Sequence, residues 1–272
     1  MLDNIKMDKQ ILKKWLKAGY IENDLFHHTQ EGTPQGGIIS PTLMVLTLQG
    51  LEAVIKRAAP KKPDKVNTIV YADDFIITAA SREILGDKVK PALKAFLAER
   101  GLELSETKTK LTHINDGFNF LGFNIRKYHP VLLIKPAKQN VLMMLRNIKS
   151  VIKKQATSSA GELVAILNPK IRGWGNYYRH VVSSQTFSYV DCQLFKSLLR
   201  WSKRRHLNKS LAWIVNKYFH MGNAHEWRFQ GWVKLKDGTR KYSQLVKMGQ
   251  IKIVRYLVSF IGYYGFIQSF RY

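Results

Sequence analysis

The sequence predicts an α+β fold, and three observations favour it. Some segments repeat apolar residues at helical spacing, whereas others are short β-branched or aromatic runs bounded by turn residues. With 272 residues, 45% of them hydrophobic, the chain can bury one large core or two smaller ones. We therefore expect a globular chain that combines helices with strands.

The first hundred residues alternate predicted helices and strands. Apolar spacing and capping residues indicate the helices, and turn residues separate them from the strands. The expected elements are a helix at 8–18 that stops near Gly19, a loop EGTPQGG at 31–37, a helix at 41–55, a loop AAPKKPDK at 58–65, a hairpin of two strands at 66–79, and a helix at 83–100 closed by Gly101.

The second half is predicted to become mainly helical. Two strands are expected first, at KTKLTHI (108–114) and at NFLGFNI (119–125). A basic amphipathic helix follows at 138–154. Its expected buried face consists of Val141, Leu142, Leu145, Ile148 and Ile152. The linker QATSSAG at 155–161 marks a boundary, beyond which a Trp-, Tyr- and Arg-rich helical segment runs to about residue 220.

Composition excludes several classes of protein. The single Cys192 allows no intrachain disulfide and no Cys-based zinc cluster, so we expect it to be a packed small side chain in a reducing compartment. The start of the sequence lacks the pattern of a signal peptide, and no run of about 18 uncharged apolar residues could span a membrane. A cytoplasmic location without membrane contact is expected.

Charge indicates the class of binding partner. The chain has 44 Lys and Arg residues against 19 Asp and Glu, a net charge of +25. Such an excess favours a polyanionic partner, and nucleic acid is the usual one. Between Lys135 and Lys209 there are fifteen basic residues and only two acids, Glu162 and Asp191. We therefore expect this half to bind RNA or DNA.

Two adjacent acids, Asp73 and Asp74, interrupt the apolar run TIVYADDFIITA. Such a pair can simply mark a turn, because Asp caps turns with its own side chain. At the tip of a hairpin the pair could instead bind divalent cations, which would offset the repulsion between the two charges. Carboxylate oxygens suit Mg²⁺, and two such ions about 3.5–4 Å apart stabilise the attacking and leaving oxygens in nucleotidyl transfer. The pair therefore favours Mg²⁺-dependent polymerisation.

Five segments, in this order, resemble the reverse transcriptases and maturases encoded by group II introns. Four of them resemble the polymerase palm: EGTPQGGIISPTLMVLTLQGLE, YADDF, LSETKTKLTHI and FNFLGFNI. The fifth, residues 166–210, begins ILNPKIRGWGNYYRHVV and resembles the maturase domain, also called domain X. The resemblance extends from residue 1 to about 232.

The resemblance implies a partial right-hand polymerase palm, an antiparallel sheet with helices, followed by an α-helical thumb and a helical maturase domain. The implied domains are the C-terminal portion of the palm at 1–134, a thumb helix and linker at 135–160, domain X at 161–240 and a divergent tail at 241–272. The implied activity is that of an RNA-directed DNA polymerase, a nucleotidyltransferase, combined with RNA binding that assists intron splicing.

The resemblance also assigns roles to residues of the palm. Taken singly, the glycine-rich stretch could be an ordinary loop and Lys108 a solvated lysine. The assigned residues are Asp73 and Asp74 as the catalytic, Mg²⁺-binding pair, Gln35, Gly36, Gly37 and Lys108 beside nucleotide and template, and Leu121 and Gly122 in the turn that supports the primer end.

In the basic half, aromatic and cationic residues alternate. Aromatic rings can stack on unpaired bases while cations bind phosphates. Alternatively, the aromatic residues pack a small helical core and the basic residues are solvated. The candidate RNA-binding residues are Arg172, Trp174, Tyr177, Tyr178, Arg179, Arg200, Lys203, Arg204 and Arg205.

The start of the sequence limits the implied activity. A complete palm of this family has a third carboxylate on an early strand, together with fingers that hold the template. MLDNIKMDK resembles the segment just after that strand, and neither Asp3 nor Asp8 is well placed to substitute. We therefore expect a truncated chain that cannot polymerise alone.

Three interpretations of function remain open. The chain is a polymerase and maturase completed by a partner, a stand-alone RNA-binding splicing factor, or an inactive remnant of a mobile element. The implied partners are group II intron RNA, an RNA template with a DNA primer, dNTP, and a chain that supplies the fingers and the missing Asp.

Overall fold

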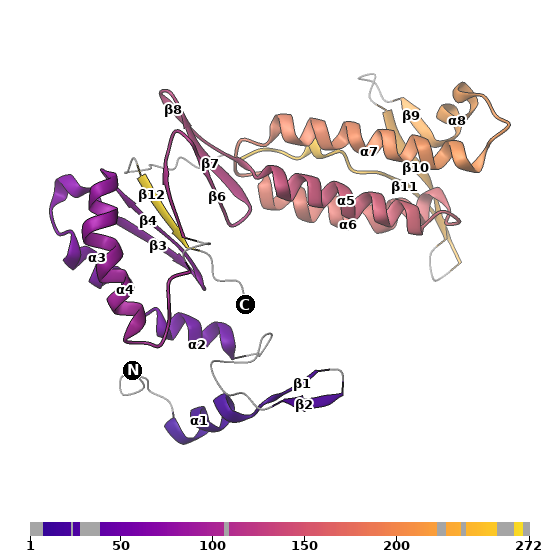
Figure 1. The fold of residues 1–272 in the computed structure, drawn as a ribbon. Coiled ribbons are helices and arrows are strands. Elements are labelled where there is room, and N and C mark those ends of the chain that lie inside the picture. The colour runs from indigo at the N-terminus through magenta and orange to yellow at the C-terminus, as the bar shows by residue number, and fades with distance from the viewer. Residues whose placement is uncertain are drawn as a thin grey trace. The chain divides into compact units, whose positions relative to one another are not determined.

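The computed structural model describes residues 8–22, 24–27, 39–105, 109–221, 227–234, 238–254 and 264–268. It confirms the α+β class, with helices and small antiparallel sheets (Figure 1). The chain divides into two compact units: unit 1 comprises residues 1–116 and 259–272, and unit 2 comprises residues 117–258. Within the described ranges, no helix has the length and apolarity needed to cross a membrane.

Unit 1 contains six strands, four α-helices and two shorter helical segments among its described residues. They are helices α1 (Lys9–Lys17), α2 (Ser40–Thr47), α3 (Leu51–Ala58) and α4 (Lys90–Ala98), the 3₁₀ helix η2 (Lys62–Asp64), the π-helix η3 (Ile84–Val89), and strands β1 (Tyr20–Glu22), β2 (Leu25–His27), β3 (Asn67–Tyr71), β4 (Asp74–Ala79), β5 (Lys110–His113) and β12 (Tyr264–Gln268).

A four-stranded antiparallel sheet with the order β3-β4-β12-β5 organises unit 1. The hairpin predicted at 66–79 is confirmed as β3 and β4, with Tyr71 paired to Asp74. Residues 75–79 of β4 are all buried. Phe75 and Ile77 join a core with residues of α3, η3 and α4. Figure 1 shows α3 and α4 beside the sheet. Helix packing therefore fixes the strand that begins at the Asp pair.

Two of the predicted helices of unit 1 are confirmed, and one prediction is wrong. Helix α1 confirms the helix expected at 8–18. It begins after Asp8, because the side chain of Asp8 caps it by accepting hydrogen bonds from the backbone N–H groups of Gln10 and Ile11. The helix expected at 83–100 begins as η3 and continues as α4. The single helix expected at 41–55 is instead two, because a turn at 48–50 separates them, in which Gly50 has φ +89° and precedes the second helix.

Unit 2 contains the remaining helices and two small sheets. Its described elements are helices α5 (Lys138–Lys154), α6 (Ala160–Tyr178), α7 (Ser184–Arg205) and α8 (Leu211–Tyr218), the 3₁₀ helix η4 (Met248–Gln250), and strands β6 (Phe118–Phe120), β7 (Phe123–Tyr128), β8 (Val131–Pro136), β9 (Phe219–Met221), β10 (Trp227–Lys234) and β11 (Arg240–Gln244).

Helices α5, α6 and α7 lie along one another and enclose the core of unit 2 (Figure 1). The predicted helix at 138–154 is confirmed by α5, which buries Val141, Leu145, Ile148 and Ile152. Leu142, expected on that face, is exposed. Helix α6 packs on β10, where the backbones meet so closely that a Cβ on Gly161 would lie 2.2 Å from the carbonyl oxygen of Trp232.

The strand expected at NFLGFNI is wrong, since this segment forms the hairpin β6–β7. Leu121 and Gly122 are its two turn residues and have φ +48° and +82°, a combination found in the tight turns that suit hairpins. Strand β8 continues this sheet, and β9 to β11 form a second sheet. The sequence analysis expected none of these four strands.

Residues 241–254, which the sequence analysis set apart as a tail, pack in unit 2. Met248 is buried, and the carboxylate of Asp191 on α7 accepts hydrogen bonds of 2.9 and 2.8 Å from the N–H groups of Met248 and Gly249. The side-chain amide of Asn168 on α6 donates to the carbonyl oxygen of Gln244 and accepts from the N–H of Val246. Cys192, expected to be packed, is exposed.

Candidate functional site

The Asp pair lies at the tip of the β3–β4 hairpin in unit 1. Ala72 and Asp73 form the two-residue loop, and Asp74 is the first residue of β4. Ala72 has φ +52°, a conformation that is strained for a residue with a side chain. Asp73 and Asp74 are both half-buried. The hairpin therefore holds two acidic residues, adjacent in sequence, at one end of the sheet.

One oxygen of this pair is buried without a hydrogen bond. Among the described side chains, Asp74 Oδ1 and Thr68 Oγ1 are the buried polar atoms that lack a hydrogen-bonding partner. Burying an unpaired oxygen of a carboxylate is costly, because it loses hydration and gains no donor in return. A divalent cation at the hairpin tip would compensate this cost, so the position of Asp74 fits a metal ligand.

The two acids alone would leave most of a cation's coordination shell to other ligands. Across the part of the chain that the structure describes, no group of three or more His, Cys, Asp or Glu residues could hold a metal ion. Mg²⁺ prefers octahedral coordination and keeps several water or phosphate ligands. Asp73 and Asp74 could therefore anchor such an ion while waters and phosphates fill its other positions.

Several predicted site residues lie outside the described residues. They are Gln35, Gly36, Gly37 and Lys108.

The turn at Leu121 and Gly122 belongs to unit 2 and is held by two tyrosines of α6. The hydroxyl of Tyr177 donates to the carbonyl oxygen of Leu121 at 2.9 Å, and that of Tyr178 donates to the carbonyl oxygen of Gly122 at 3.1 Å. A Cβ on Gly122 would lie 2.8 Å from Tyr178 Oη. Glycine is therefore required both by the positive φ and by the space available.

Tyr178 is protonated at neutral pH, as this contact requires. The pKa of Tyr178 is raised to about 12, mainly by burial and also by the neighbouring Tyr177, while a hydrogen bond with Asn140 acts in the opposite direction. The hydroxyl therefore remains a donor to the turn over the physiological range.

The predicted RNA-binding aromatic residues have different environments. Tyr178 is buried, at 2% exposure, and so is Trp201, the aromatic residue that follows Arg200 in the sequence, at 5%. Trp174 is half-buried and packs on Tyr178 with ring centroids 4.4 Å apart. Tyr177 is about half exposed and stacks on Phe123. Tyr178 and Trp201 thus both belong to the core of unit 2.

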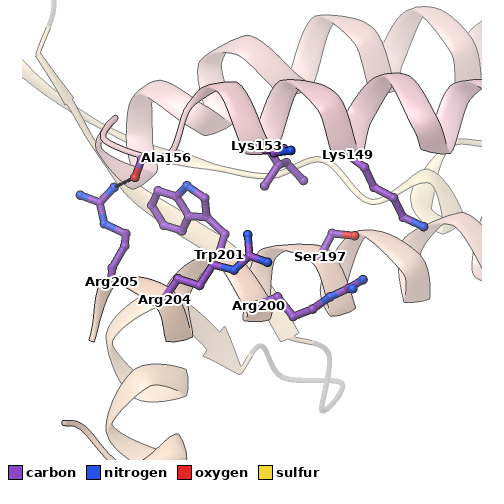
Figure 2. A pocket seen from close by; sticks show the side chains of 9 residues that line it. Lys149, Lys153, Ala156, Ser197, Arg200, Trp201, Arg204 and Arg205 are labelled. Carbon is purple, nitrogen blue, oxygen red and sulfur yellow. Dashed lines mark hydrogen bonds between the residues drawn. The ribbon is translucent and has the colours of Figure 1, made fainter. Parts of the chain in front are cut away.

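A basic pocket of about 320 Å³ lies between α5 and α7 of unit 2 (Figure 2). Helix α5 and its C-terminal end contribute one wall, and α7 contributes the other. The lining residues are Lys149, Ile152, Lys153, Ala156, Ser197, Arg200, Trp201, Arg204 and Arg205. Five of these are cationic and none is acidic, so the pocket has the charge of an anion-binding site.

Arg205 is fixed at one end of this basic pocket. Its guanidinium Nη1 donates to the carbonyl oxygens of Ala156 and Ser158 at 2.8 and 2.6 Å, and the guanidinium lies 4.5 Å from the ring centroid of Trp201. The indole N–H of Trp201 in turn donates to the carbonyl oxygen of Gln155 at 2.9 Å. These bonds close the α5–α6 linker onto α7 and shape the pocket.

The other cations of the basic pocket are exposed. Figure 2 shows Lys149 on the α5 side and Arg200 and Arg204 on the α7 side, with the space between the helices separating them. Long cationic side chains that converge from two helices can contact the same phosphodiester backbone.

The structure brings together some of the predicted RNA-binding residues. Arg200, Arg204 and Arg205 line the basic pocket, whereas Lys203 is exposed elsewhere on α7, and Arg172 and Arg179 lie on or at the end of α6. The sequence analysis missed Lys149 and Lys153. Their i,i+4 spacing on a helix already predicted as basic and amphipathic was a usable signal, since such residues share a face.

Comparisons with known proteins match two successive parts of the chain to two family models. A family model described as "Reverse transcriptase (RNA-dependent DNA polymerase)" matches residues 1–125. A second, described as "Group II intron, maturase-specific domain", matches residues 141–219. The first match includes the Asp hairpin, and the second includes the basic pocket.

The chain is also similar to three curated proteins. The chain is 25% identical over 301 residues to the group II intron-encoded protein LtrA of Lactococcus lactis subsp. cremoris, which covers 78% of this chain and 50% of LtrA. It is 28% identical over 189 residues to protein YkfC of Escherichia coli K12, covering 58% of this chain and 46% of YkfC. It is 25% identical over 267 residues to an uncharacterized 91 kDa protein in the cob intron of Schizosaccharomyces pombe, covering 68% of this chain and 33% of that protein. The chain thus spans about half the length of LtrA and YkfC, and a third of the yeast protein.

Proposed function

Because the chain belongs to the family of group II intron-encoded reverse transcriptases and maturases, we propose that unit 2 binds group II intron RNA through the basic pocket between α5 and α7. The observation that carries this proposal is the convergence of five cations, without an acid, on one pocket. Binding of this kind would assist intron splicing.

The chemistry of the basic pocket suits a folded RNA backbone. Phosphate contacts release counterions, so binding through cations weakens steeply as salt concentration rises. Trp201 and Arg205 fasten the α5–α6 linker to α7 and so fix one end of the pocket. The pocket would therefore recognise the backbone of a structured RNA more than its base sequence.

The experiment is filter binding of the full chain to a structured group II intron RNA at several salt concentrations. The variant combines Lys149→Gln, Arg200→Gln and Arg204→Gln, which removes three cations and leaves Arg205 in place. If each cation contacts one phosphate, the slope of log affinity against log salt should fall by up to about three units.

A matched control removes three exposed cations from α1 of unit 1, as Lys13→Gln, Lys14→Gln and Lys17→Gln. It lowers the net charge by the same amount and should change the slope much less. Equal losses in the two variants would show that overall charge rather than the basic pocket drives binding, and would refute the proposal.

A second candidate function belongs to unit 1, and the buried, unpaired Oδ1 of Asp74 favours it. We propose that Asp73 and Asp74 are the carboxylate pair of an RNA-directed DNA polymerase and that they would hold Mg²⁺. When bound, Mg²⁺ would stabilise negative charge on the phosphoryl oxygens of dNTP. The chain's own residues would anchor the ion, because β4 is buried and holds Asp74 at the hairpin tip.

Two carboxylates supply only one side of a two-metal cage, so a polypeptide with a further Asp would be required in trans. Primer extension on an RNA template tests this. We expect no Mg²⁺-dependent extension by the chain alone, and extension after addition of a polypeptide that contains the fingers and the early Asp strand of a relative. Extension by the isolated chain would refute the need for a partner, and Asp73→Ala that retained complemented activity would refute the role of the pair.

The same two assays distinguish the remaining interpretations. RNA binding through the basic pocket, without primer extension after the second polypeptide is added, would favour the stand-alone splicing factor. The absence of both RNA binding and primer extension would favour the inactive remnant.

A further inference from the structure

One face of the β10–β11 hairpin, called the outer face below, carries two exposed aromatic side chains that contact each other. Trp232 of β10 is paired with Tyr242 of β11, and their ring centroids lie 5.0 Å apart with the ring planes inclined at 60°. The two side chains are 60% and 41% exposed. A single exposed aromatic residue is ordinary, whereas a contacting pair forms an apolar patch, and such patches mark contact surfaces.

The opposite face of the hairpin fixes it to α6. Side chains alternate between the two faces of a strand, so Gly231 faces away from Trp232. A Cβ on Gly231 would lie 2.5 Å from the backbone nitrogen of Gly161 on α6, and Phe229, on the same side as Gly231, is buried. This close backbone contact therefore holds the aromatic pair outward.

The polar groups beside the aromatic pair suit a nucleotide. Strands β10 and β11 contain four basic residues and no acid. On the outer face, Gln244 accepts a hydrogen bond of 3.5 Å from Arg228 and donates one of 3.2 Å to Gln230. Arg240, toward the other end of the same face, is exposed. Cations on both sides of an aromatic pair can contact the phosphates that flank a base stacked on it.

Charge argues against a second copy of the chain as the occupant of the outer face. With a net charge of +25, two copies would repel each other, and the hairpin strands offer no acid to a cation of the partner. The two strands also lie outside both family matches, which cover residues 1–125 and 141–219. The matched domains therefore assign no role to this face.

We propose that the outer face is a stacking platform for an unpaired nucleotide of a structured RNA. The base stacks on Trp232, the more exposed ring, and Tyr242 supports the indole, because two rings inclined at 60° cannot both lie parallel to one base. Arg228 and Arg240 contact the neighbouring phosphates. Bases in an RNA helix are already stacked on one another, so the platform selects loops and bulges. The proposal rests on RNA binding by unit 2, but not on the basic pocket as its site.

The test uses the full chain and two hairpin RNA probes of equal length and charge. One probe has a bulge of three unpaired adenosines, and in the other the bulge nucleotides are abasic, so that the phosphates remain and the bases are missing. Fluorescence anisotropy gives both affinities at several salt concentrations. The wild type should bind the adenosine probe about tenfold more tightly, as expected for one stacked base. Because stacking releases no counterions, this affinity ratio should not change with salt.

Trp232→Ala should bring the affinity ratio close to one, and Trp232→Phe, which keeps an aromatic face, should retain part of it. Trp213→Ala is the matched control, since Trp213 is another exposed tryptophan of unit 2, at 38%, and its loss should leave the ratio unchanged. The platform would be overturned by a ratio of one in the wild type, by an unchanged ratio in Trp232→Ala, or by equal losses in Trp232→Ala and Trp213→Ala.

The basic-pocket variant, Lys149→Gln with Arg200→Gln and Arg204→Gln, separates this inference from the proposed function. It should reduce the salt dependence of binding for both probes and leave their affinity ratio unchanged. Reduced salt dependence with a wild-type ratio of one would support the basic pocket and overturn the platform. Unchanged salt dependence with a tenfold ratio would support the platform and refute the basic pocket.

Sedimentation of the chain without RNA tests the other occupant. The wild type and Trp232→Ala should sediment alike, because the proposal assigns the outer face to RNA. A dimer that Trp232→Ala converts to a monomer would assign the face to a second copy and would overturn the proposal.

Discussion

The hydroxyl of Tyr178 donates a hydrogen bond of 3.1 Å to the carbonyl oxygen of Gly122, a residue 56 positions earlier in the chain. The same carbonyl accepts from the N–H of Ala137 at 2.9 Å. Helix α6 therefore holds the β6–β7 turn, which the family resemblance associates with support of the primer end. Residues from the reverse transcriptase match and from the maturase match meet at this contact.

Tyr178→Phe should lower the free energy of unfolding of unit 2 by about 1 kcal/mol, the usual net value of one hydrogen bond. The loss stays small because the carbonyl of Gly122 keeps its bond to Ala137. Five of the six tryptophans lie in unit 2, so urea unfolding followed by tryptophan fluorescence reports mainly on this unit. Tyr177→Phe is the matched control, since its bond to Leu121 is exposed and should contribute less. Equal destabilisation by the two variants would contradict this ranking.

The pKa of Tyr178 predicts a loss of stability in alkali. Its pKa is raised to about 12 in the folded chain from about 10 when unfolded. Below pH 10 the hydroxyl is neutral in both states; above it the unfolded state loses the proton first. Stability from this residue should therefore decline as pH rises from about 10 to 12. Unfolding curves at several pH values for the wild type and Tyr178→Phe should converge across this window, whereas a constant difference would exclude the linkage.

Locally determined parts of the structure could be predicted from the sequence. The β3–β4 hairpin was predictable because apolar, β-branched strands flank a short turn, and helix α5 because its apolar residues recur at helical spacing. The Asp pair was predictable as a candidate site for the same reason, since its position depends on one hairpin. Of the basic pocket, Arg200, Arg204 and Arg205 were predictable from charge and aromatic neighbours alone.

Features that depend on distant contacts could not be predicted. Gly50 breaks an apolar run that reads as one helix, and Leu121 adopts a positive φ although leucine rarely does so. The burial of Tyr178 and Trp201 depends on how α5, α6 and α7 pack, which no local pattern contains. Strand β12 pairs with strands more than 150 positions earlier, so its aromatic, apolar sequence indicated no partner.

Ala72→Gly should stabilise unit 1, because glycine adopts the positive φ of this loop position without strain. The gain should be up to about 1 kcal/mol, since a non-glycine residue in this conformation costs about 1–2 kcal/mol and glycine loses more entropy on folding. Hydrogen exchange of the β4 amides measures it, because those amides report on unit 1 alone. Gly101→Ala, at another position of unit 1 with positive φ, should have the opposite effect. Faster exchange in Ala72→Gly would show that the strain is compensated by contacts of the alanine methyl group.

Asp74→Asn should stabilise unit 1 in the absence of a divalent cation and abolish its response to Mg²⁺. The substitution removes a half-buried charge beside Asp73, and with it the desolvation cost of an unpaired carboxylate oxygen. Protection of the β4 amides against hydrogen exchange should therefore increase by about tenfold, equivalent to roughly 1.4 kcal/mol. Mg²⁺ should increase protection in the wild type by mass action, because it binds only the folded hairpin, and should have little effect on the variant.

Asp87→Asn is the matched control, since Asp87 is an exposed acid of the same unit and should alter neither the protection of the β4 amides nor its response to Mg²⁺. If Mg²⁺ protected β4 equally in the wild type and in Asp74→Asn, the ion would be bound elsewhere and the Asp pair would not be its site.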